Sequence, residues 1–201
     1  PFAMYHVDPD HKEREFLTLD ELTAMTEIKL EDPNMAFARD LFIFGCWTGI
    51  SFIDIKNLTE DNISMINGAP WIVSKRQKTG VPFQIKLMDI PMQIIGRYKA
   101  FRKGSHLFNI GNLDSINKRI KKVAAMCGIK KRVSFHVSRH SWAVLALEYG
   151  MPIESVSKIL GHTNITTTQI YAKVTSTKLE HDISVFESRI KGHLPAMGGM
   201  A

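Results

Sequence analysis

The chain has 201 residues, of which 44% are hydrophobic and 23% charged, proportions that are typical of one globular domain with a sizeable core. No apolar run reaches the roughly 18 residues of a membrane span and no signal peptide opens the sequence, which favours a cytoplasmic protein without membrane contact. The net charge of +6 at pH 7 indicates an acidic partner, most often nucleic acid, although an excess of lysine can also serve solubility alone.

The N-terminal part predicts a lead-in followed by helices. Residues 1–17 form a polar lead-in. The stretch Thr18-Leu19-Asp20-Glu21 is a capping box, which predicts a helix that runs to about Leu30. Asn34 is the expected cap of the next helix, whose apolar residues lead into a turn at Thr48-Gly49-Ile50.

The hydrophobic pattern changes its period between residues 63 and 87. Segments rich in β-branched residues alternate there with two turn signals, Asn67-Gly68 and Lys78-Thr79-Gly80. We therefore expect a three-stranded antiparallel meander with basic residues at its second hairpin.

Helical periodicity returns after the meander. The expected helices span residues 89–102, 114–127, 137–149, 152–159, 166–173 and 176–190. The predicted fold is mainly α with a small antiparallel β-sheet (α+β), in one domain over residues 18–190. Residues 191–201 are expected to be a flexible C-terminal tail.

A first group of polar residues lies on an otherwise apolar helix. His136, Arg139 and His140 follow i, i+3, i+4 spacing and share one face. Val144 and Leu147 continue that face, so it points partly inward, where a cation needs a partner or a chemical task. The structural alternative is an ion pair of Arg139 beside histidines that serve the core or a cap. A metal site is disfavoured, because the glutamate of HExxH and a cysteine pair are both missing.

A second polar group follows downstream. Leu160-Gly161-His162 ends one expected helix, and Tyr171 lies on the next. Taken alone, Tyr171 suits a core position beside Ile170, and the two helices suit a helix-turn-helix that reads DNA. A folding argument alone, however, does not explain a phenol, histidines, an arginine and a hairpin lysine on one basic domain.

The arrangement His136-x-x-Arg139-His140, then Leu160-Gly161-His162, then Tyr171, resembles the tyrosine recombinase or phage integrase family. The likeness extends upstream through "FGCWTGISFIDIKNLTEDNI" and the hairpin "KRQKTGV", and covers roughly residues 18–185. The segments "TGISFIDIKNL" and "RQKTG" are most similar to the corresponding segments of integrases from Bacteroides-type conjugative and mobilisable elements. The resemblance implies that residues 18–190 are the catalytic domain and that residues 1–17 lead in from an upstream core-binding domain.

The resemblance also implies catalytic roles for five side chains, with no metal and no cofactor. Tyr171 would attack the scissile phosphate and form a 3′-phosphotyrosyl link. Arg139 and His162 would bind the non-bridging oxygens, where negative charge develops. His136 would accept the tyrosine proton, and Lys78 at the hairpin tip would protonate the leaving 5′-oxygen. Two further residues would orient these groups: His140 and Asp54.

One position departs from the family pattern. The Thr-Gly-Leu-Arg box of the family reads Thr48-Gly49-Ile50-Ser51 here, so a serine stands in place of the other phosphate-binding arginine. Ser51 can donate one neutral hydrogen bond but cannot replace a bidentate cation. Three readings remain open: the site works with Ser51, or Arg39 or Arg76 reaches in as the substitute, or the protein binds DNA without cutting it.

The leading hypothesis is a metal-independent DNA integrase that serves the integration or excision of a mobile element at the bacterial nucleoid. Its expected partner is double-stranded DNA, on which the family forms tetramers. This chain alone would be a monomer, and accessory DNA-bending proteins are further candidate partners. A type IB topoisomerase would share the chemistry. The competing hypothesis is a non-catalytic DNA-binding module whose site has decayed at Ser51.

Overall fold

The structure, a computed structural model, describes residues 15–172 and 176–191. Most of the expected lead-in and the expected tail from residue 192 onward lie outside this part. Within the described part, no helix is both long and apolar enough to cross a membrane. The helices and strands are α1 (Leu19–Glu27), α2 (Pro33–Thr48), α3 (Phe52–Lys56), η1 (Glu60–Asn62), β1 (Ile63–Ile66), β2 (Ala69–Lys75), β3 (Pro82–Lys86), α4 (Asp89–Arg97), η2 (Lys99–Phe101), α5 (Leu113–Met126), α6 (Phe135–Glu148), α7 (Ile153–Leu160), α8 (Thr166–Gln169) and α9 (Ser176–Ile190).

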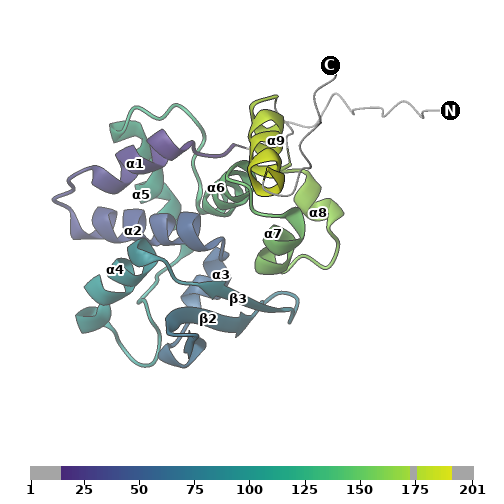
Figure 1. Ribbon diagram of the computed structural model, residues 1–201. Helices are drawn as coiled ribbons and strands as arrows, with labels where there is room; N and C mark the ends of the chain where they lie inside the picture. Colours follow the sequence, from purple (N-terminus) through teal and green to yellow (C-terminus); the bar gives the residue numbers. More distant parts are fainter. Residues whose placement is uncertain (1–14, 173–175, 192–201) are drawn as a thin grey trace, which may run out of the picture.

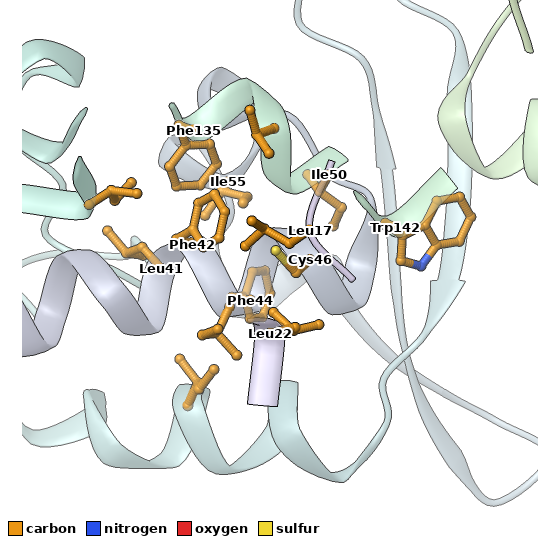
Figure 2. Packing of buried hydrophobic residues seen from close by; sticks show 14 of the residues in the cluster. Leu17, Leu22, Leu41, Phe42, Phe44, Cys46, Ile50, Ile55, Phe135 and Trp142 are labelled. Carbon is orange, nitrogen blue, oxygen red and sulfur yellow. The ribbon is translucent and has the colours of Figure 1, made fainter. Parts of the chain in front are cut away.

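Helix α2 forms the centre of the helical core. It contacts α1, α4, α5 and α6 (Figure 1), and every residue from Ala38 to Cys46 is buried. Figure 2 shows Phe42 and Phe44 of α2 among the buried side chains, with Phe135 of α6 and Leu22 of α1. Because α2 is covered on all sides, its sequence is apolar around the whole helix rather than amphipathic.

Local sequence fixes both ends of α2. The Asp32 carboxylate accepts a hydrogen bond from the Asn34 N–H at 2.8 Å, and Pro33 fills the first helical position, where an N–H is not needed. The cap is therefore Asp32, and the expectation of an Asn34 cap is wrong. At the other end, Gly49 adopts φ 64°, and a Cβ there would lie 2.6 Å from the Trp142 ring, so only glycine fits.

The sheet is the predicted three-stranded antiparallel meander, in the order β1-β2-β3. The β1–β2 turn is Asn67-Gly68, and both residues have positive φ, as a type I′ hairpin requires. Ile72 of β2 pairs with Ile85 of β3, and both side chains are buried. The second hairpin closes where the Arg76 N–H donates to the Val81 carbonyl at 2.8 Å. The fold class predicted from the sequence is therefore confirmed.

Several helix boundaries differ from the expectation. Helix α6 begins at Phe135 rather than at residue 137, because the Asn117 side chain of α5 accepts a hydrogen bond from the Phe135 N–H at 2.7 Å. Helix α4 ends early and the chain continues as η2, while α8 is a single turn. The short helix α3, which the sequence pattern did not predict, follows the turn after α2.

The folded domain includes the last residue of the expected lead-in. The Leu17 side chain is fully buried, and its N–H donates to Ser141 Oγ at 2.8 Å. The predicted capping box follows directly, because Thr18 and Glu21 each bind the other's backbone N–H.

Candidate active site

Arg139 lies where the ends of α2 and α7 meet. Its Nη1 donates to the Gly49 carbonyl at 2.8 Å, and its Nη2 donates to the Leu160 carbonyl. Gly49 caps α2 and Leu160 is the last residue of α7. Because carbonyl groups at helix C-termini carry partial negative charge, two helix ends hold the guanidinium in place.

A second basic side chain, His162, contacts Arg139. Its Nε2 lies 3.3 Å from Arg139 Nη2, and its Nδ1 lies 2.9 Å from Thr168 Oγ1. The pKa of His162 is lowered to about 4, first by burial and then by the positive charges of Arg139 and Arg76. The imidazole is therefore neutral at pH 7 in the protein without DNA.

The charges around Arg139 show which groups lie close to it. The pKa of Arg139 is lowered to about 10, first by burial and then by the positive charge of Arg76. Tyr171 and Asp54 act on the same pKa in the opposite direction. Arg139 still carries its charge at pH 7, so two guanidinium groups share this region.

Arg76 is buried at the end of the β2–β3 hairpin. Its Nη1 donates to Asp54 Oδ2 at 2.9 Å, and its Nη2 donates to the Ile159 carbonyl at 2.5 Å. Its guanidinium carbon lies 3.8 Å from the centroid of the Phe83 ring, which is a cation–π contact. Among the described residues, Arg76 Nε is one of two buried side-chain nitrogens without a hydrogen-bond partner. One donor of this buried cation is therefore not used by the fold.

The side chains of Ser51 and Arg76 both bind the carboxylate of Asp54. Its Oγ donates to Asp54 Oδ2 at 2.7 Å, and the Gln77 N–H donates to Asp54 Oδ1 at 2.8 Å. Asp54 thus joins the turn after α2 to the hairpin that carries Arg76. The structure places Asp54 where it orients a basic side chain, and places Ser51 beside that carboxylate.

Gly161 packs directly against Arg76. It ends α7 with φ 66°, a left-handed conformation that favours glycine. A Cβ at this position would lie 2.9 Å from Arg76 Nε and 3.0 Å from Arg76 Cγ. The missing side chain of Gly161 therefore makes room for the arginine.

Arg139, His162 and Arg76 form one basic cluster. Tyr171 lies near this cluster and is only 8% exposed. Its hydroxyl oxygen lies 2.9 Å from His140 Nδ1. The ring of His136, which is exposed, has its centroid 4.1 Å from that of His140. The His140 ring thus contacts the phenol of Tyr171 and also the ring of His136.

Two of the candidate residues are not brought into the cluster. Lys78 is exposed in the turn of the β2–β3 hairpin, two positions after Arg76. Arg39 lies about 13 Å before the end of α2 along its axis, and its Nη1 donates to the carbonyls of Thr26 and Ile28, each at 3.0 Å. Arg39 therefore satisfies the C-terminus of α1, and the structure does not place it beside Arg139 and His162.

Sequence reasoning missed the contact between Thr168 and His162. Thr168 is fully buried, although threonine has no apolar pattern that predicts burial. The signal in the sequence that could have indicated this contact was the position of Thr168, three residues before Tyr171. No group of three or more His, Cys, Asp or Glu side chains that could hold a metal ion occurs among the described residues.

Lowering the pH from 7 to 4 should destabilise the wild-type protein more than a His162→Gln variant. The folded pKa of His162 is about 4, whereas an unfolded histidine has a pKa of about 6.5, so the unfolded chain takes up this proton first. The stability due to His162 is fully present above pH 6.5 and is lost as the pH falls from 6.5 to 4. Urea denaturation across this range measures the effect, and identical pH slopes for both proteins would contradict it.

Sequence comparison gives the context of this site. The profile of the Phage integrase family matches residues 15–178. The tyrosine recombinase XerC of Natranaerobius thermophilus is 39% identical over 195 residues, covering 90% of this chain and 65% of that protein. XerD of Listeria monocytogenes is 42% identical over 72 residues, covering 36% of this chain and 24% of that protein. The chain thus spans less than two thirds of the length of these relatives.

Solved structures show the same fold. The XerH recombinase in a pre-cleavage complex with its difH substrate superposes with a TM-score of 0.69 at 20% identity, over 88% of this chain and 55% of that chain. The Tn1549 transposon integrase in complex with circular intermediate DNA gives a TM-score of 0.67 at 18% identity, over 88% and 67%. Because the family profile covers most of the sequence and the fold agrees, the chain belongs to the phage integrase family of tyrosine recombinases and has the fold of their catalytic domain.

Proposed function

We propose that this protein is a site-specific DNA recombinase that cleaves and rejoins strands through a 3′-phosphotyrosyl intermediate. One observation carries the proposal: Arg139, Arg76 and His162 form a basic cluster close to Tyr171. The two arginines carry like charges that repel each other, so such a cluster is expected where an anion binds. A phosphodiester is an anion whose phosphorus a phenol can also attack.

In the proposed reaction, Tyr171 Oη bonds to the phosphorus while the 5′-oxygen leaves, so the number of phosphodiester bonds is unchanged. The phenol proton passes to the pair of histidines, since His140 contacts Tyr171 and the His136 ring contacts His140. Lys78 protonates the leaving 5′-oxygen. Because the 5′-hydroxyl of a second strand can attack the phosphotyrosine in turn, the step is reversible and allows strand exchange.

We assign the role of the missing arginine to Arg76 rather than to Ser51 or Arg39. Arg76 donates to the carbonyl of Ile159 and Arg139 donates to the carbonyl of the next residue, Leu160, so both guanidinium groups lie at the end of α7. Asp54 orients its guanidinium, and its Nε has no partner. A phosphate bound between the two arginines would relieve their repulsion and accept hydrogen bonds from both.

Double-stranded DNA is the proposed partner. The similar XerH and Tn1549 integrase structures are complexes with DNA, and a net charge of +6 suits a phosphate backbone. The amino-acid sequence of the segment around residues 48–58 favours the integration or excision of a Bacteroides-type mobile element as the biological role. This reaction would take place in the cytoplasm, at the nucleoid. The likeness to a transposon integrase is consistent with that role.

A covalent trap tests the proposal. The protein is mixed with a pool of nicked duplexes of randomised sequence, in which the short strand released by cleavage diffuses away and prevents rejoining. We expect a protein–DNA adduct that resists detergent, with a nucleotide attached to Tyr171 in the digested peptide. DNA binding in a gel-shift assay without any adduct would instead favour the non-catalytic binding module that Ser51 suggests.

The exposed face of α9 suggests how copies of the chain assemble on DNA. Leu179, Ile183 and Phe186 follow i, i+4, i+7 spacing and are 53%, 52% and 61% exposed. We propose that this apolar stripe contacts a second protomer in a tetramer on DNA, because water is an unfavourable environment for three such side chains on one face.

Removing α9 by truncation after Ser176 should weaken cooperative binding to DNA with two sites more than binding to DNA with one site. The reason is that the stripe contributes only when a neighbouring protomer is present. Gel-shift titrations on one-site and two-site DNA measure the difference. The triple variant Leu179→Ser, Ile183→Ser, Phe186→Ser is the control that keeps the helix. Equal loss on both DNAs would mean that α9 packs only on its own domain.

A further inference from the structure

The His162 ring is held at both of its nitrogens. Nε2 lies 3.3 Å from Arg139 Nη2, and Nδ1 lies 2.9 Å from Thr168 Oγ1. An imidazole bound at only one nitrogen could rotate and present either edge. The two contacts together fix which nitrogen of His162 faces the basic cluster.

The partners also determine where the proton of the neutral ring lies. A guanidinium group has five N–H donors and no acceptor, so the nitrogen that faces Arg139 must offer its lone pair. Nε2 is therefore the unprotonated nitrogen. The single N–H of the neutral ring is then at Nδ1, and it donates to the Thr168 hydroxyl oxygen.

Thr168 is well placed to keep this arrangement. Its side chain is fully buried in the single turn of α8, and its carbonyl accepts the Tyr171 N–H at 3.0 Å. A buried hydroxyl is unfavourable unless it forms a hydrogen bond, and valine would fill the same space without that cost. The hydroxyl is thus explained by its contact with His162 rather than by packing.

We propose that Thr168 is a positioning residue, whose hydroxyl fixes the orientation and the tautomer of His162 so that Nε2 faces the phosphate site. The proposal rests on the recombinase function proposed above, in which His162 contacts the scissile phosphate. The bond from Nδ1 to Thr168 is the same whether Nε2 carries a lone pair or a proton. The ring can therefore keep its place when a phosphate oxygen replaces Arg139 as the neighbour of Nε2.

The first test needs no DNA. Nitrogen NMR of histidine-labelled protein distinguishes the two tautomers, and His162→Gln identifies the signal. We expect the Nδ1–H tautomer in the wild type and in Thr168→Ser. We expect a mixture of tautomers in Thr168→Val, because a ring without the hydroxyl at Nδ1 can turn away from Arg139. A Thr168→Val protein that keeps the wild-type signal would overturn the proposal.

The second test measures the rate of adduct formation in a single turnover. Thr168→Val should slow it about tenfold, the effect of one lost hydrogen bond, while Thr168→Ser should retain the rate. In a His162→Gln background, Thr168→Val should cause no further loss, provided that melting temperatures show folded proteins. Equal losses in both backgrounds would overturn the proposal, because Thr168 would then act on Tyr171. A wild type without any adduct would overturn the proposed function, while the NMR result would still decide the role of Thr168.

Discussion

Replacing Tyr171 with phenylalanine should abolish covalent attachment to DNA. The substitution removes only the hydroxyl oxygen that would bond to phosphorus, so no adduct can form. The ring remains in its buried position, and the lost hydrogen bond to His140 should lower stability by only about 1 kcal/mol. Detergent gels measure the adduct, and gel-shift titration should show nearly unchanged binding.

A second tyrosine offers a matched control. Tyr149 follows α6 and is 68% exposed, so Tyr149→Phe makes the same chemical change away from the cluster. This variant should form adduct at the parental rate. An adduct that persists in Tyr171→Phe would place the nucleophile elsewhere in the chain.

Replacing Arg76 with alanine should lower the single-turnover cleavage rate by about 10²–10³, the usual effect of removing one donor to a developing negative charge. The substitution also leaves the Asp54 carboxylate buried without its cation, which is destabilising in itself. Arg76→Lys separates the two effects. A lysine keeps the charge beside Asp54 but lacks the planar fork that can bind Asp54, Ile159 and a phosphate together.

Arg39 supplies the control for the loss of a buried arginine. Arg39→Ala removes hydrogen bonds to the carbonyls of Thr26 and Ile28, so it should lower the melting temperature and leave the cleavage rate of the folded protein near the parental value. A large loss of cleavage in this variant would contradict the assignment to Arg76. So would a folded Arg76→Lys protein that cleaves at the parental rate.

A rescue experiment sharpens the assignment. Ser51→Arg restores an arginine at the position where the family has one, next to Asp54. Added to Arg76→Ala, it should recover part of the cleavage rate, because the new guanidinium can pair with the same carboxylate and reach the same cluster. Ser51→Ala alone should have a small effect, since it removes one neutral hydrogen bond.

The parts of the fold that the sequence predicted are those that short segments determine. The capping box at Thr18, the Asn67-Gly68 turn and the Gly49 helix end depend on residues next to each other, and the structure confirms all three. The start of α6 was misplaced for the opposite reason. Its first N–H is satisfied by Asn117, 18 residues earlier in the chain, and no local pattern reveals that partner.

The candidate site also has one part that the sequence predicted and another that depends on tertiary contacts. The spacing of Arg139, His162 and Tyr171 predicted which residues belong together, because the motif of the family carries that information. Our proposal that Arg76 takes the place of the absent arginine could not be made from sequence, since Arg39 and Arg76 are chemically identical. The tertiary contacts distinguish them: one binds carbonyl groups at the end of α1, and the other binds Asp54 beside the cluster.

The close contact between Gly161 and Arg76 has a consequence for how this protein can vary. A helix end with positive φ can also accept asparagine, so the turn alone would permit some change at this position. The contact with Arg76 does not permit such a change, because even one added carbon at position 161 would lie 2.9 Å from the guanidinium nitrogen Nε. In a library of random variants, position 161 should therefore tolerate fewer residues than Gly128 and Gly150, which have open space around them, and losses there should be losses of activity as well as of stability. A change at Arg76 to a smaller residue is the kind of mutation that would let a side chain return at position 161, so these two positions are expected to change together.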